Sequence, residues 1–331
     1  MKRRVGLALL AFVCVVLAAG VFGWRSRGTV AAWLAPAKTP STQMSEKARS
    51  ANAKFWDTFH AGRYDDIDEV IETLTAAYLE DPRDAETAAH IAFAHNWKLS
   101  EAARLDKLPA TITDHVVLSR KYFSEAVRLA PRDQRYRGFH AGMELAEGSL
   151  HADESLTRRG YYDLMNSVAG WPEFNLFTAG YIFSRLPHGD PKYADGVAYQ
   201  WRNLDVCVLE KVDRRTVRYD QYMSMETTEG PKRVCWNSWI APHNFEGFFL
   251  NMGDMLVKQG DPATARRAYS NAKLSKTYDR WPFKSVLENR IAQADENVAQ
   301  LRNPRPGEKN RTMMIMSAFA CMACHQQENQ R

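Results

Sequence analysis

Apolar residues recur at helical spacing along most of this 331-residue chain. One stretch carries them at Ile67, Val70, Ile71, Leu74 and Tyr78, so that the five side chains share one face of a helix. No run of alternating apolar and polar residues is long enough to predict a half-buried strand. The pattern therefore predicts an all-α fold.

Turn signals divide this helical pattern into segments. Ser45-Glu46 is typical of a helix start and Ala61-Gly62 of its end, and the next helix is expected to stop at Asp81-Pro82. Two stretches do not fit a repeating pattern, namely an insertion from Leu99 to Thr113 and a segment from Asp213 to His243. We expect these two segments to leave the regular helical array.

One helix pair has a recognisable sequence. The segment Asn251 to Tyr269 combines Gly253 in a first helix, Gly260 at a turn and Ala268-Tyr269 in a second helix. It resembles a tetratricopeptide repeat, and weaker copies lie upstream. The resemblance implies an α-solenoid over residues 45–308, with an antiparallel pair at residues 244–277 whose close contact involves Gly253 and Ala268. A generic helical bundle with similar turns is the alternative.

The N-terminus has the features of a retained export signal. A basic start precedes Val5 to Trp24, which is twenty residues long without a charge or a proline. A helix of that length spans roughly 30 Å, the thickness of a bilayer core. We therefore predict a transmembrane anchor within residues 1–28 and a polar linker at 29–44, with the remainder exported to the periplasm. Cleavage after Ala18-Ala19-Gly20 is the alternative.

The net charge of +5 comes entirely from this N-terminal segment, which holds Lys2, Arg3, Arg4, Arg25 and Arg27 and no acid. Without these five, the 44 basic residues fall to 39, matching the 39 acidic residues. A neutral soluble part offers no basic field, so nothing in the composition predicts a nucleic-acid partner.

The most specific motif lies near the C-terminus, where Cys321-Met322-Ala323-Cys324-His325 follows the Cys-x-x-Cys-His pattern. It resembles the attachment segment of c-type cytochromes. The resemblance implies one haem c bound covalently through Cys321 and Cys324, with His325 as an axial iron ligand. We expect residues 309–331 to form the helix that bears the haem.

Other interpretations of the motif have less support in the sequence. A zinc site would need a second Cys/His cluster of matching spacing, and none is present. A thioredoxin-like Cys-x-x-Cys follows a strand, whereas the preceding residues Thr312 to Phe319 favour a helix. A disulfide would leave His325 without a role.

The opposite iron ligand is not defined by the motif. Met316 would lie about 14 Å from His325 along one continuous helix, which is too far to reach the same iron. Met252, Met255, His243 and His140 are weak candidates elsewhere in the chain, and an open sixth position is the alternative.

Cys207 and Cys235 are the other cysteines of the part expected to be exported. In an oxidising compartment they are candidates for a disulfide, with two buried thiols as the alternative. Cys235 lies in the loop Thr227 to His243, whose length is typical of loops that cover a site.

Together these features predict a membrane-anchored monohaem cytochrome of the electron-transfer type, whose helical repeats dock a protein redox partner. The alternative is an interaction scaffold in which haem serves sensing or structure. No acid–base constellation beside the motif indicates an enzyme.

Overall fold

The computed structural model describes residues 20, 26–32, 34–303, 313–314 and 317–327. The chain divides into two compact units, Met1–Thr39 and Pro40–Arg331. In the first unit, residues 26–32 are helical. Among the described residues no helix is both long and apolar enough to cross a membrane. The anchor predicted at Val5 to Trp24 lies, except for Gly20, outside that part of the chain.

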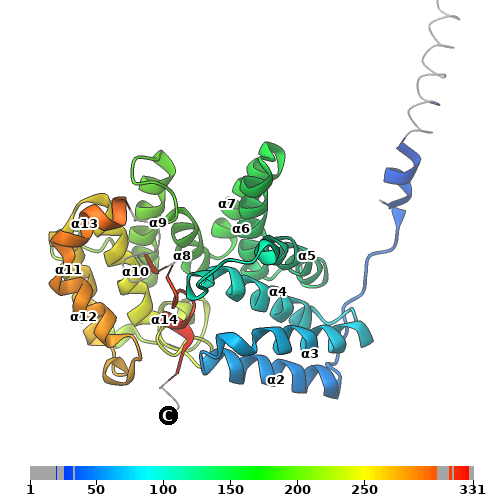
Figure 1. Ribbon diagram of the computed structural model, residues 1–331, viewed down its shortest axis with the longest axis horizontal. Helices are drawn as coiled ribbons and strands as arrows, with labels where there is room; N and C mark the ends of the chain where they lie inside the picture. Colours follow the sequence, from blue (N-terminus) through cyan, green and yellow to red (C-terminus); the bar gives the residue numbers. More distant parts are fainter. Residues whose placement is uncertain (1–19, 21–25, 33, 304–312, 315–316, 328–331) are drawn as a thin grey trace, which may run out of the picture. The chain divides into compact units, whose positions relative to one another are not determined.

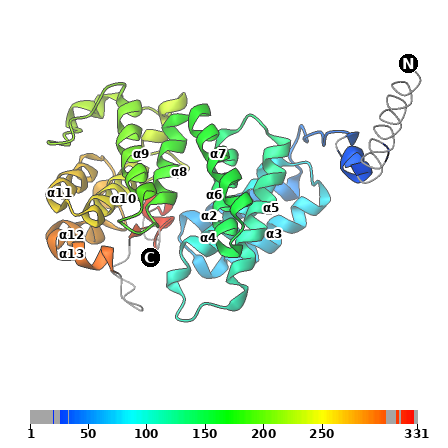
Figure 2. The same ribbon diagram turned by 90° about the horizontal axis from the view of Figure 1, so that it is seen from above.

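The second unit contains helices and loops, and its described residues include no strand, which confirms the all-α prediction. Its first eight α-helices pack mostly against their neighbours in chain order (Figures 1 and 2). They are α2 (Glu46–His60), α3 (Ile67–Glu80), α4 (Ala85–Ser100), α5 (Asp114–Leu129), α6 (Gln134–His151), α7 (Glu154–Gly170), α8 (Pro172–Phe183) and α9 (Pro191–Val208).

The C-terminal part continues with α10 (Asn244–Gln259), α11 (Pro262–Asn271), α12 (Lys284–Ala292), α13 (Ala294–Arg302) and the short α14 (Met322–His325). The two stretches expected to interrupt the array do so. The first contains the 3-10 turns η2 (Ala102–Arg104) and η3 (Ala110–Thr113), and the second contains η4 (Asp220–Met225) and η5 (Pro231–Cys235). These segments place loops beside the site described below.

Side-chain caps explain where several helices begin. Ser45 accepts a hydrogen bond from the backbone N–H of Ala48 at the start of α2, as the sequence predicted. Asp190 and Asp261 cap α9 and α11, and each is followed by a proline at the first helical position. An N-cap oxygen satisfies a backbone donor that the helix leaves free, and proline has no such donor to lose.

The helix pair predicted at residues 244–277 is present as α10 and α11. Gly253 lies against α11, but its nearest neighbour is the Tyr269 ring, where an added Cβ would come within 2.2 Å of a ring carbon, rather than Ala268. At the turn, Gly260 has φ +102°, a conformation that side-chain-bearing residues rarely adopt. Glycine at these two positions therefore permits both the turn and the close helix contact.

A disulfide joins Cys207, in the last turn of α9, to Cys235 in η5. Their Cα atoms are 5.9 Å apart, within the range that a disulfide requires. This confirms the pairing considered from the sequence. It ties the long loop before α10 to the helix that precedes it.

The C-terminal segment returns to the beginning of the array. Helix α14 contacts both α10 and α2, and the red segment lies between these two helices in Figures 1 and 2. Residues 318–321 form a turn, and only Met322–His325 is helical within residues 317–327. The haem-bearing helix predicted over residues 309–331 is thus much shorter where the structure describes it. The buried packing of this segment against two helices, rather than helical propensity, determines its conformation.

Candidate functional site

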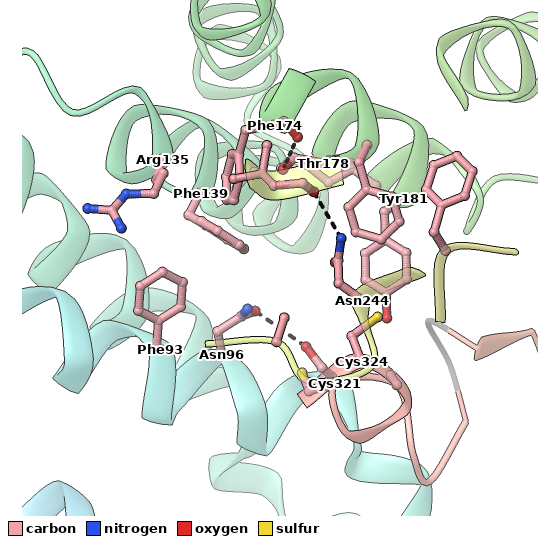
Figure 3. A pocket seen from close by; sticks show the side chains of 18 of the residues that line it. Phe93, Asn96, Arg135, Phe139, Phe174, Thr178, Tyr181, Asn244, Cys321 and Cys324 are labelled. Atoms are coloured by element: carbon pink, nitrogen blue, oxygen red, sulfur yellow. Dashed lines mark hydrogen bonds between the residues drawn. The ribbon is translucent and has the colours of Figure 1, made fainter. Parts of the chain in front are cut away.

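A cavity of about 1630 Å³ lies inside the second unit and reaches the C-terminal motif. Cys321, Cys324 and His325 all line it, so the structure brings the three predicted site residues to one wall. Aromatic side chains from several helices form much of the remaining surface, and Figure 3 shows part of it. They include Phe55, Phe93, Phe139, Phe174, Phe177 and Phe248.

Glu101 holds the start of the motif. Its Oε1 accepts hydrogen bonds from the backbone N–H groups of Cys321 and Met322 at 2.8 and 2.9 Å. Its Oε2 pairs with Arg104 Nε at 2.7 Å, and no part of Glu101 is exposed. Desolvation raises the pKa of Glu101, whereas Arg104 and the backbone N–H of Met322 oppose that rise. The carboxylate therefore fixes the turn on which both cysteines sit.

Two other groups hold the end of the motif. Trp281 Nε1 donates to the carbonyl of Ala323 at 2.8 Å, and the backbone N–H of His243 donates to the carbonyl of Cys324 at 2.9 Å. Gly247 on α10 provides the space for the second thiol, because a Cβ there would lie 2.2 Å from Cys324 Sγ. The motif is consequently anchored on both sides by buried groups.

Both cysteines of the motif are free thiols. Burial raises the pKa of Cys324 to about 12, and it raises the pKa of Cys321 well above the ordinary thiol value. Redox-active Cys-x-x-Cys pairs instead have a lowered thiol pKa, because the thiolate is the reactive form. The electrostatics of this pair are thus opposite to those of a thioredoxin-like site.

His325 is oriented by the loop before α10. Its Nδ1 lies 2.8 Å from the carbonyl oxygen of Ile240. A carbonyl only accepts, so Nδ1 carries the proton and the lone pair of Nε2 remains available. The ring packs against Phe59 at a centroid distance of 4.8 Å, and burial lowers the pKa of His325 to about 4. A neutral imidazole with one nitrogen held by a carbonyl is the form that binds metals.

None of the four distal candidates proposed from the sequence lines the cavity. Met252 and Met255 are packed in the core around α10, and His243 Nδ1 pairs with Glu246 at 3.1 Å. His140, on α6, is also absent from the cavity wall. The sequence could not identify the residues of this wall, because side chains from distant helices form it.

Other side chains with ligating atoms do line the cavity, namely Met143, Met314 and His90. His90 stacks on Phe55 at 4.5 Å, and its Nδ1 pairs with the side-chain oxygen of Asn52, so its Nε2 is available. Met314 is completely buried. Met316, excluded above on helix length, lies outside the described residues.

The sequence analysis did not identify Glu101 as a site residue. Its only signal was its position in the insertion Leu99 to Thr113, which leaves the regular array. Two polar residues of the wall, Tyr181 and Arg185, were also missed as site residues, because nothing in their local sequence relates them to a motif 140 residues away.

Within the described ranges, no group of three or more His, Cys, Asp or Glu side chains is arranged to hold a metal ion. No family model, no curated protein and no solved structure matches this chain significantly.

Proposed function

We propose that this chain carries one covalently bound haem c and acts in electron transfer. The observation that carries the proposal is the anchored Cys-x-x-Cys-His turn in the wall of a large aromatic cavity. Cys321 and Cys324 would hold the haem through thioether bonds, and His325 would bind the iron through Nε2. When bound, the haem would supply a one-electron couple.

The residues at the site fit this group in three respects. The cavity exceeds the roughly 300–1,000 Å³ of typical small-molecule pockets, so it has room for a porphyrin. Its aromatic lining suits a flat apolar ring system. The two thiols are free and the imidazole is neutral, which are the states that attachment and iron binding require.

The contact between His325 and the exposed segment Trp239-Ile240 favours electron transfer. The carbonyl of Ile240 accepts from His325, and Ile240 and its neighbour Trp239 are 43% and 62% exposed. Trp239 also contacts the ring of Trp56 at a centroid distance of 5.1 Å. An exposed apolar pair beside the axial histidine suits the docking of a protein redox partner, since aromatic groups are enriched at such interfaces.

The wider architecture belongs to the same proposal. We propose that α2–α13 are tetratricopeptide-like repeats that present this docking surface, and that residues 1–28 anchor the chain in the inner membrane with the second unit in the periplasm. The buried Cys207–Cys235 disulfide supports an oxidising compartment.

Binding or sensing of a small ligand by the haem is the second candidate function. It is favoured by the volume of the cavity, which extends well beyond the motif, and by the absence of the four predicted distal candidates from its wall. A haem with an open sixth position would bind a gas there.

The reduced optical spectrum with and without carbon monoxide separates these functions. A carrier with a sixth ligand from Met143, Met314 or His90 should be low-spin and should not bind carbon monoxide. Rapid stoichiometric binding with high-spin bands would contradict electron transfer as the main role and support ligand binding. Replacing each of the three residues in turn by Ala or Leu should identify the ligand, because only one variant should become high-spin.

A further inference from the structure

We infer that Arg185 and Tyr181 form a carboxylate-binding subsite in the cavity wall beside the Cys-x-x-Cys-His turn. The inference deepens the proposed function, on which it rests for the identity of one of its two candidate ligands. The shared chemistry is a carboxylate, supplied either by a haem propionate or by a small free acid that enters the cavity.

Arg185 differs from the other arginines of the cavity wall. Arg135 pairs with Asp133 at 2.6 Å, Arg158 pairs with Glu154 at 2.8 Å, and Arg233 donates to the carbonyl of Gly230 at 2.5 Å. The Arg185 guanidinium makes no ion pair or side-chain hydrogen bond within the part of the chain that the structure describes. It is therefore a cation that lacks the protein partner its counterparts have.

The surroundings of Arg185 leave its guanidinium accessible to a ligand. Arg185 is exposed and also lines the cavity, so a ligand in the cavity can reach its guanidinium, whose pKa the neighbouring protein lowers. The one neighbour that opposes this effect is Tyr181, and no carboxylate contributes. Arginine stays charged, so an anion beside this guanidinium would form the ion pair that no described carboxylate provides.

Tyr181 supplies a second unused donor. Its hydroxyl is buried and has no hydrogen-bond partner among the described residues. The side chain extends from α8 toward the region of Cys324 in Figure 3, and the thiols of Cys321 and Cys324 raise its pKa in addition to the effect of burial. A buried hydroxyl without a partner is unfavourable, so this donor suits an acceptor that enters the cavity.

The two groups define the ligand chemistry. A guanidinium and a phenol present donors next to a positive charge, and the guanidinium has no acceptor. A carboxylate satisfies both at once and neutralises the charge, whereas a cation would be repelled. Tyr181 lies in the last turn of α8, which ends at Phe183, and Arg185 follows two residues later. Both line the same cavity beside this helix end, where one ligand group can meet both.

The test starts from full-length protein without haem, in the Cys321→Ala/Cys324→Ala background, with acetate as the probe. Thermal stabilisation is measured as a function of acetate concentration in this background and after adding Arg185→Gln, Tyr181→Phe or Arg158→Gln. We expect Arg185→Gln to weaken the apparent acetate affinity at least tenfold, as the loss of a charge-assisted hydrogen bond does. Tyr181→Phe should weaken it less, and the control Arg158→Gln, which also lines the cavity, should leave it unchanged. Equal acetate responses in all four proteins, or no response in any, would overturn the subsite.

The haem-loaded protein then distinguishes the two sources of carboxylate. If a propionate occupies the subsite, acetate no longer stabilises the loaded protein. The midpoint potential then depends on pH through the ionisation of that propionate, and Arg185→Gln raises the pKa of this ionisation by about one unit. If the subsite takes a free acid, acetate still binds and Arg185→Gln still weakens it. Failure to load haem in any protein would contradict the proposed function alone, because the acetate series requires no haem.

Discussion

The two cysteine pairs of this protein differ in almost every physical respect. Cys207 and Cys235 are 28 residues apart and form a disulfide that joins α9 to the long loop. Cys321 and Cys324 are three residues apart on one turn and remain thiols that line the cavity. The first pair reduces the entropy of the unfolded chain, whereas a bond between the second pair would close too short a segment to constrain it.

The groups around each pair explain this difference. The disulfide lies at the main core, beside Trp236 and other large apolar side chains. The turn that carries the thiol pair is held by a buried carboxylate and a tryptophan N–H, and Gly247 leaves room for Cys324 Sγ. The fixed position of the second pair supports the proposal that it serves chemistry, whereas the first pair serves stability.

The largest loss of stability is expected when the contacts that anchor the turn of the thiol pair are removed. Glu101→Ala removes the acceptor of two backbone N–H groups and leaves Arg104 without its ion pair. Losing one partner of a buried pair typically costs 3–5 kcal/mol, and we expect about 4 kcal/mol here, measured by urea unfolding. Glu154→Ala, which removes a solvent-exposed pair with Arg158, should cost less than about 0.5 kcal/mol. A similar cost for the two variants would contradict the role assigned to Glu101.

Removing the disulfide should have the next largest effect. For a loop of 28 residues, chain entropy predicts that Cys207→Ala/Cys235→Ala lowers the free energy of unfolding by about 3.6 kcal/mol. The haem content of the folded variant should stay at the wild-type level, because neither sulfur belongs to the motif. Unchanged stability, or loss of haem from the folded variant, would contradict the view that only the first cysteine pair stabilises the fold and only the second binds haem.

A smaller loss of stability is expected when the space beside Cys324 Sγ is filled. Gly247→Ala places a methyl group within 2.2 Å of Cys324 Sγ, and Gly253→Ala places one within 2.2 Å of the Tyr269 ring. Both should cost about 1–3 kcal/mol in thermal or urea unfolding, since overpacking forces neighbours to move. Only Gly247→Ala should also lower haem loading. If both variants load haem equally well, Gly247 does not position the second thiol.

The fold was largely predictable because its determinants are local. Helical spacing, Ser45 at a helix start and Gly260 at a turn act within a few residues, and the structure has the corresponding helices and turn. The motif could be recognised for the same reason, since five adjacent residues carry it. The cavity could not be predicted from the sequence, because Phe93, Phe139 and Phe174 come from different helices and only their packing brings them together. Glu101 was missed for the same physical reason, as it meets Cys321 across 220 residues.

The last expected effect concerns pH. Burial, with a smaller contribution from Arg135, lowers the pKa of His90 to about 3, whereas an unfolded histidine titrates near pH 6.5. Below pH 6.5 the unfolded chain binds a proton that the folded chain does not, so stability is full above this pH and falls as pH decreases toward 3. The slope should approach 1.4 kcal/mol per pH unit for this group, measured by urea unfolding between pH 6 and 4. His90→Gln should lower this slope by the contribution of one titrating group. An unchanged slope would show that His90 is accessible to protonation in the folded state.

The central claim is that Cys321 and Cys324 bind haem covalently, and intact-protein mass spectrometry after denaturation tests it most directly. Protein expressed together with the cytochrome maturation machinery should show one added haem in the wild type and in Cys207→Ala/Cys235→Ala. Cys321→Ala/Cys324→Ala should show none, while its circular dichroism remains helical. A wild-type mass without haem, or equal haem retention in both double variants, would contradict the account.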